Sequence, residues 1–155
     1  MKVELSKLVH KCAEVEQAMA ELYLLYMQRY PDDADFWEGL YNEELRHIAF
    51  LVNGDMFDAF GDRLDQIPLP SEAFVDRARS SAFTALDQAR QRSVPLEEAL
   101  YVVLNLEESV VESFVGEALE GDLDGSPFMT LISDTRSHAD MLRNFMRRKG
   151  FIKIS

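Results

Sequence analysis

Cysteine, proline and glycine are scarce in this sequence. Its only cysteine is Cys12, which excludes a disulfide within the chain, a CxxC zinc knuckle and an iron site built from four cysteine ligands of this chain. With 7 glycines and 5 prolines among 155 residues, long uninterrupted helices are easy to accommodate. Because no strand pattern competes with the helical one, we expect an all-α fold.

Long apolar runs and positive charge are also in short supply. No apolar stretch approaches the roughly 18 residues that a membrane span needs, and no basic-then-apolar leader opens the chain. The 16 Lys and Arg are outnumbered by 28 Asp and Glu, which gives a formal net charge of -12. An acidic surface disfavours nucleic acid and anionic membranes but attracts cations. We therefore expect a cytoplasmic protein without a nucleic-acid or membrane partner.

The remaining composition is that of an ordinary globular domain. Hydrophobic residues make up 47% of the chain and charged residues 28%, which does not suit a disordered protein. A chain of 155 residues is long enough to bury a sizeable core. We expect one domain over residues 1–155.

Capping residues and helix breakers divide the chain into four long helices and one extra helix. Breakers lie at Pro31, Gly61, residues 66–70 and Gly150. The predicted helices run from about 3 to 29, from the caps Asp32 and Asp33 to about 60, from the cap Ser71 to about 91, from Pro95 to about 121, and from Ser126-Pro127 to 149.

The connections between these helices predict their topology. Short turns join the first long helix to the second and the third to the fourth, so each pair should be an antiparallel hairpin. A long connection over residues 61–94 links the two pairs and carries the extra helix. Bundles with one such crossover have ferritin-like connectivity. The expected fold is a ferritin-like antiparallel four-helix bundle with an extra helix in its crossover.

Polar residues interrupt the apolar stripe of each long helix near its midpoint. In chain order these residues are Glu16, then Glu44 and His47, then Glu107, and finally Thr135 and His138. The midpoints of all four helices share one layer in an up-and-down bundle. Because a buried, unpaired carboxylate is very costly, three glutamates in one core layer need a cation to hold them. The pattern therefore predicts a metal site.

The residue types indicate which metal. Glu44 and His47 are three residues apart and point to the same side of a helix. A carboxylate oxygen together with an imidazole nitrogen suits iron, manganese or zinc better than calcium or magnesium. Two of the three histidines fall at the midpoints, whereas His10 lies outside the layer and has no assigned role.

Each residue also has an interpretation without a metal. A lone ExxH is usually a solvated helix face, and His138 alone is more often a hydrogen-bonded core histidine than a ligand. Glu16 and Glu107 have acidic neighbours, so a different helical register would turn them onto a charged surface. The aromatic residues of the stripes are interpreted as core packing. The combination at matched midpoints is what favours a metal.

At these residues the sequence resembles the rubrerythrin-like branch of the ferritin-like superfamily. That family has a glutamate seven residues before an aromatic on one helix and ExxH on the next, and repeats both features in a second helix pair. The first half here reads Glu16, Tyr23, Glu44 and His47, and the second reads Glu107, Phe114, Thr135 and His138. The resemblance covers the four long helices, which are most of the chain.

The resemblance implies a role for each candidate ligand. Glu16 and Glu107 would be terminal carboxylate ligands, one per metal. His47 and His138 would each bind one metal. Glu44 would bridge the two ions, which are expected to be iron.

Two positions depart from the family pattern. Thr135 stands where a second bridging glutamate is expected, and the adjacent Asp134 is about 100° around the helix. Val110 replaces an extra glutamate that some rubrerythrins carry three residues after the third-helix ligand. Three carboxylates leave two divalent ions net positive by one, which a hydroxide could neutralise. A di-metal site and a single metal near Glu16, Glu44 and His47 both stay open.

The resemblance implies redox chemistry of iron with oxygen or peroxide, of peroxidase or ferroxidase type, with no catalytic residue beyond the ligands. A peroxidase would need a separate electron donor, since the chain has no four-cysteine iron site. The alternative is a non-catalytic bundle that binds one metal or none and acts in interaction or sensing. An oxygenase acting on an organic substrate would require an access cavity. By resemblance, a homodimer is the expected assembly.

Overall fold

The computed structural model describes the backbone of residues 2–52, 71–120 and 127–152 and the side chains of residues 6–52, 71–109 and 137–152. These residues form five α-helices and one 3₁₀ turn, and they contain no strand. The elements are α1 (Lys2–Arg29), η1 (Pro31–Asp33), α2 (Ala34–Val52), α4 (Glu72–Gln91), α5 (Leu96–Glu120) and α6 (Pro127–Lys149). The predicted all-α class is confirmed.

Local chemistry explains where the helices begin and end. Ser71 caps α4 as predicted, because its Oγ accepts a hydrogen bond of 3.1 Å from the Phe74 backbone N–H. At the end of α6, Gly150 adopts a φ of +80° and donates to Arg147, while Phe151 donates to the Met146 carbonyl. This pair of bonds is the Schellman arrangement, which a glycine at this position favours.

The helices α2 and α5 begin close to the residues predicted from the sequence. Asp32 and Asp33, expected to cap the second helix, lie in the 3₁₀ turn η1, which leads directly into α2. Pro95 directly precedes α5, and its carbonyl accepts a hydrogen bond from the Ala99 N–H. The predicted end of the second helix near residue 60, the breaker at 66–70 and the cap Ser126 lie outside the described residues.

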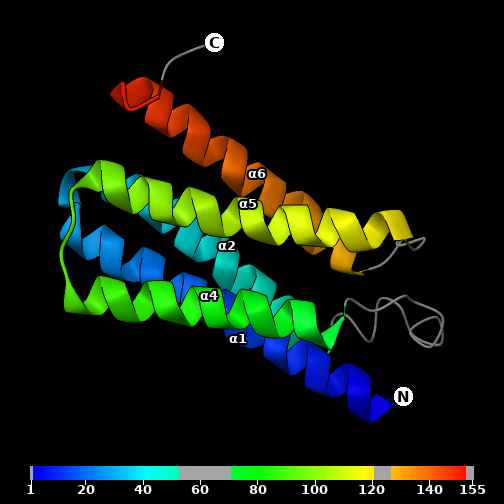
Figure 1. Ribbon diagram of the computed structural model, residues 1–155. Coiled ribbons are helices and arrows are strands. Elements are labelled where there is room, and N and C mark those ends of the chain that lie inside the picture. The colour runs from blue at the N-terminus through cyan, green and yellow to red at the C-terminus, as the bar shows by residue number, and fades with distance from the viewer. Residues whose placement is uncertain (1, 53–70, 121–126, 153–155) are drawn as a thin grey trace.

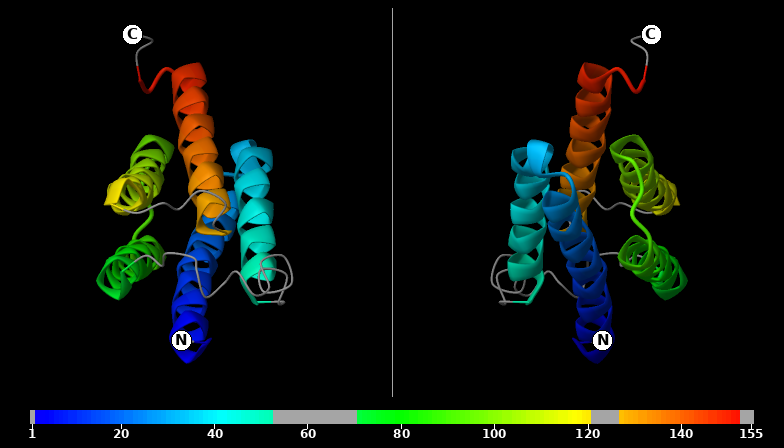
Figure 2. Two further views of the ribbon diagram at one scale, coloured as in Figure 1. Left: turned by 90° about the vertical axis from the view of Figure 1, so that its right-hand side faces the viewer. Right: turned by 90° about the vertical axis from the view of Figure 1, so that its left-hand side faces the viewer.

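The helices pack as two antiparallel pairs with α4 along one side (Figure 1). α1 packs against α2 and against α4, and α5 packs mainly against α6. Figure 2 shows α1 and α6 in the middle of the molecule, with α2 on one side and α4 and α5 on the other. α4 also contributes to the core. Its buried residues are Phe74, Val75, Ala82, Ala85, Leu86 and Ala89.

An aromatic cluster fills the core near the turn between α1 and α2. We call it the Trp37 layer, and its members are Tyr23, Tyr26, Tyr30, Phe36 and Trp37. The Trp37 ring is fully buried, 5.0 Å from the Tyr26 ring and 5.2 Å from the Phe36 ring. Such offset and edge-on contacts stabilise a core beyond the burial of apolar area alone. None of the described helices combines the length and apolar character required to cross a bilayer.

Candidate metal centre

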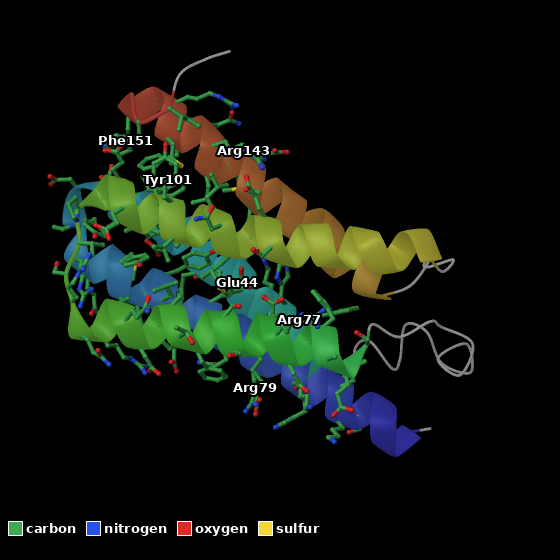
Figure 3. The ribbon with its side chains drawn as sticks, in the orientation of Figure 1. Glu44, Arg77, Arg79, Tyr101, Arg143 and Phe151 are labelled. Atoms are coloured by element: carbon green, nitrogen blue, oxygen red, sulfur yellow. The ribbon has the colours of Figure 1, made fainter. Side chains whose placement is uncertain are left out.

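Four helices bring the five predicted ligands together in the interior. We call these residues the Glu/His cluster, and they are Glu16 on α1, Glu44 and His47 on α2, Glu107 on α5 and His138 on α6. Glu44 and His138 are only 2% and 1% exposed, and His47 and Glu107 are also buried. Figure 3 labels Glu44, which is seen between the ribbons of α4 and α5.

One half of the cluster lies between α1 and α2. The His47 Nδ1 atom is 3.5 Å from Glu16 Oε2 and 3.4 Å from Glu44 Oε2. The three side chains each offer a ligand atom, and these atoms lie within 4.8 Å of one another. Glu16 keeps 16% of its side chain exposed, which makes this half the more accessible one.

The other half lies between α2, α5 and α6. The His138 Nδ1 atom is 3.2 Å from Glu44 Oε1 and 3.5 Å from Glu107 Oε1. These three side chains likewise offer ligand atoms within 4.8 Å of one another. All three are buried.

Glu44 belongs to both halves and divides its two oxygens between them. Its Oε2 faces His47 and its Oε1 faces His138. The two imidazole rings lie on either side, with centroids 5.6 Å apart and planes inclined by 21°. A carboxylate in this position can join two cations with one oxygen on each.

Glu43 contacts the cluster although the sequence did not single it out. Its carboxylate forms a hydrogen-bonded ion pair with Nε2 of His138. A histidine that ligates a metal commonly donates its other ring N–H to a carboxylate, which fixes the ring orientation and the tautomer. With Nε2 engaged by Glu43, the Nδ1 atom of His138 is the one turned toward Glu44 and Glu107. The pair of adjacent glutamates at 43 and 44 is the sequence signal that could have suggested this contact.

Tyr23 also reaches the cluster, although its ring was interpreted as core packing. Its hydroxyl donates a hydrogen bond to Glu107 Oε1, and its ring stacks 6.0 Å from Trp37. Burial and the negative charge of Glu107 hold the pKa of Tyr23 well above its ordinary value. The phenol therefore stays protonated and remains a donor to the carboxylate.

Protons occupy the cluster when no cation is bound. Burial and the adjacent charge of Glu44 raise the pKa of Glu16 to about 8. Burial lowers the histidine pKa values, but the neighbouring carboxylates outweigh it and raise them to about 10 for His47 and about 11 for His138. Glu16, His138 and His47 together lower the pKa of Glu44 despite its burial. Two imidazolium charges thus balance the buried carboxylates.

The donor set fits a metal in spite of this proton balance. Glu44 Oε2 and His138 Nδ1 are buried and have no well-formed hydrogen bond to any residue in the described part of the chain. Both atoms belong to the groups of three described above, whose remaining members are carboxylates and imidazoles. Buried polar atoms left without a hydrogen bond are costly, and a cation ligated by them would remove that cost.

His10 and Cys12, which were also noted in the sequence, are not members of the Glu/His cluster. His10 is exposed on α1 and lies 3.9 Å from Glu14, outside the cluster. Cys12 is buried, and burial together with Glu16 raises its pKa to about 12, so its thiol is not an activated nucleophile. The side chains of Val110, Phe114, Asp134 and Thr135 lie outside the described residues.

The chain matches no family model, no curated protein and no solved structure. The inference of a metal centre therefore rests on the positions and chemistry of these side chains.

Proposed function

We propose that this protein is a ferritin-like di-iron carboxylate protein, similar to rubrerythrins, that acts on peroxide or oxygen. One observation carries the proposal: Glu44 directs one carboxylate oxygen to each of two Glu/His groups. Neither group alone would distinguish a metal site from a hydrogen-bonded polar core. A shared carboxylate between two such groups is the arrangement that a two-metal centre requires.

The residues would divide between the two ions in a simple way. Glu16 and His47 would hold one ion, Glu107 and His138 the other, and Glu44 would bridge. Mixed oxygen and nitrogen ligands suit iron, with manganese and zinc as competitors.

Glu43 adds a negative charge that the sequence argument did not include. Glu16, Glu44 and Glu107 leave two divalent ions net positive by one. The Glu43 carboxylate lies against His138 and can offset this remaining charge without binding either ion.

Two iron ions held in this centre would supply two electrons for the reduction of an oxygen–oxygen bond. The contribution of the chain is to position the ligands and to hold protons. Glu16 has a pKa of about 8, so its carboxyl group exchanges a proton near neutral pH at the more accessible half of the cluster. Tyr23 keeps Glu107 hydrogen-bonded in the buried half. A peroxidase cycle would draw its electrons from a separate protein partner.

Iron reconstitution under anaerobic conditions tests this proposal. We expect two iron ions per chain, falling to one or fewer when Glu44→Ala removes the shared carboxylate. His10→Ala is the matched control, because His10 is exposed and outside the cluster. Fewer than one iron per chain in the parent protein, unchanged in Glu16→Ala and His138→Ala, would reject the di-iron centre.

The catalytic part is tested separately. Steady-state consumption of hydrogen peroxide with a supplied reductant should require bound iron and should be lost in Glu44→Ala. A chain that binds two iron ions but consumes neither peroxide nor oxygen would support the alternative of a non-catalytic binding or sensing protein. Thr135→Glu should tighten iron binding by supplying a second bridging carboxylate, and unchanged binding would count against the helical register on which the ligand set is based.

A further inference from the structure

A cavity of about 200 Å³ lies between α1, α4 and α5, outside the Glu/His cluster. Its apolar walls include Met19 from α1, Phe74 and Ala78 from α4, and Leu106 from α5. An engineered apolar protein cavity of about 150 Å³ binds benzene. The cavity therefore has room for one aromatic ring or a short alkyl chain.

One side of the cavity carries a cation that has no counter-ion among the described residues. Arg77 lines it, is exposed, and forms neither an ion pair nor a hydrogen bond within the part of the chain that the structure describes. By contrast, Arg79 and Arg90 on the same helix are paired with Glu14 and Glu21. A guanidinium of this kind matches the geometry of a carboxylate.

The cavity adjoins the segments that carry two of the candidate ligands. Val15, which lines it, directly precedes Glu16, and Leu106 directly precedes Glu107. Met19 lies one turn after Glu16 on the same side of α1. Figure 3 shows Arg77 near the beginning of α4.

We infer that this cavity binds a small amphipathic carboxylate, such as an aromatic or short-chain acid. The apolar part of the ligand would lie against Met19 and Leu106, and its carboxylate would pair with Arg77. The hydroxyls of Ser81 and Ser109, which also line the cavity, can donate to the same carboxylate. This site goes beyond the proposed di-iron function and does not depend on a metal.

Benzoate is a suitable probe, with detection by NMR of the full-length chain carrying ¹³C-methyl methionine. We expect benzoate to shift the Met19 methyl signal, whereas the signal of Met27, on the same helix but away from the cavity, should not move. Ala78→Leu should abolish the shift by filling the space. No movement of the Met19 signal up to the solubility limit of benzoate would overturn the proposal.

Charge recognition is tested by two matched comparisons. Arg77→Gln should weaken benzoate binding about three- to tenfold, and the neutral benzyl alcohol should bind the parent chain with a similar loss. Arg90→Gln, which removes a paired arginine outside the cavity, should leave benzoate binding unchanged. Equal binding of benzoate and benzyl alcohol, or no effect of Arg77→Gln, would contradict a carboxylate site.

Benzoate binding by a variant that does not bind iron tests the cavity separately from the proposed di-iron function. The Glu44→Gln variant, expected to lose iron, should still bind benzoate with the parent affinity. If benzoate bound only in the iron-loaded chain and irrespective of Arg77 and Ala78, the acid would be a metal ligand and the cavity site would be rejected. Failure to bind iron in the parent chain would leave the cavity result intact.

Discussion

The Trp37 layer and the Glu/His cluster are neighbouring parts of one helical interior, and they are held together by opposite chemistry. Trp37 and Glu44 are both almost completely buried, with 0% and 2% exposure. Burying the indole contributes favourable free energy, whereas burying the carboxylate costs free energy unless cations or protons surround it. The Trp37 layer therefore stabilises the folded chain, whereas burial of the Glu/His cluster lowers the stability of the metal-free chain unless protons or cations neutralise it.

The largest effect should come from breaking the apolar side of this comparison. Trp37→Ala removes the centre of the aromatic layer and should lower the free energy of unfolding by about 3–5 kcal/mol. Chemical denaturation of the metal-free chain measures this. Phe83→Ala, at a ring that is 38% exposed, should change it by less than about 1 kcal/mol. Similar losses for the two variants would mean that the Trp37 layer is not the main source of stability.

Tyr23 belongs to both regions, so its hydroxyl can be removed while its ring is kept. Tyr23→Phe should cost about 1.5–3 kcal/mol in the metal-free chain, because Glu107 loses a buried donor while the stacking on Trp37 persists. Tyr101→Phe is the control, since that exposed hydroxyl makes only a 3.3 Å bond to a backbone carbonyl. Equal effects in denaturant would place the role of Tyr23 in its ring alone.

Glu43 tests the cluster without removing a candidate ligand. Glu43→Ala should weaken iron binding about 10- to 100-fold, because His138 loses the partner that fixes its ring, and Glu43→Gln should give an intermediate loss. Competition with a chelator measures the affinity. Glu38→Gln, at an exposed position of the same helix, should have no effect. An unchanged affinity in Glu43→Ala would show that His138 needs no support from Glu43.

The stability of the metal-free chain should also show a pH dependence opposite to that of most buried carboxylates. Folding raises the pKa values of Glu16, His47 and His138 to about 8, 10 and 11, so the folded chain binds more protons than the unfolded chain at neutral pH. The stability of the metal-free chain should fall as pH rises, by about 3 kcal/mol between pH 7 and pH 8, of which Glu16 contributes about 1 kcal/mol. Bound metal should reverse the trend, because it displaces these protons. Denaturation at several pH values, with and without metal, decides this, and a metal-free stability that rises with pH would be incompatible.

The fold and the cluster differ in how far sequence predicts them. Helices capped by Ser71 or ended at Gly150 depend on local chemistry, and the structure bears these boundaries out. The meeting of Glu16, Glu44, His47, Glu107 and His138 follows from helical periodicity and an up-and-down topology. A sequence shows which residues share one face of a helix, and that information was sufficient to predict that these five residues meet.

The contacts of Glu43 and the Tyr23 hydroxyl were not predictable in the same way. Both depend on how two helices approach each other and on side-chain rotamers, which periodicity does not specify. The packing of α4 and the shape of the cavity beside it likewise depend on how neighbouring helices approach each other. The expectation that three buried glutamates need a metal was also incomplete, because His47 and His138 can supply positive charge as imidazolium ions.

The division of the Glu44 carboxylate has a consequence for how the centre would load. Since one side chain serves both halves, the occupancy of one half changes the charge and orientation that the other encounters. The two binding events are then thermodynamically linked, and the factor by which either ion alters the affinity for the other is the same in both directions. A chain with one ion bound is a distinct species with its own affinity, and two independent, identical sites would not describe its titration.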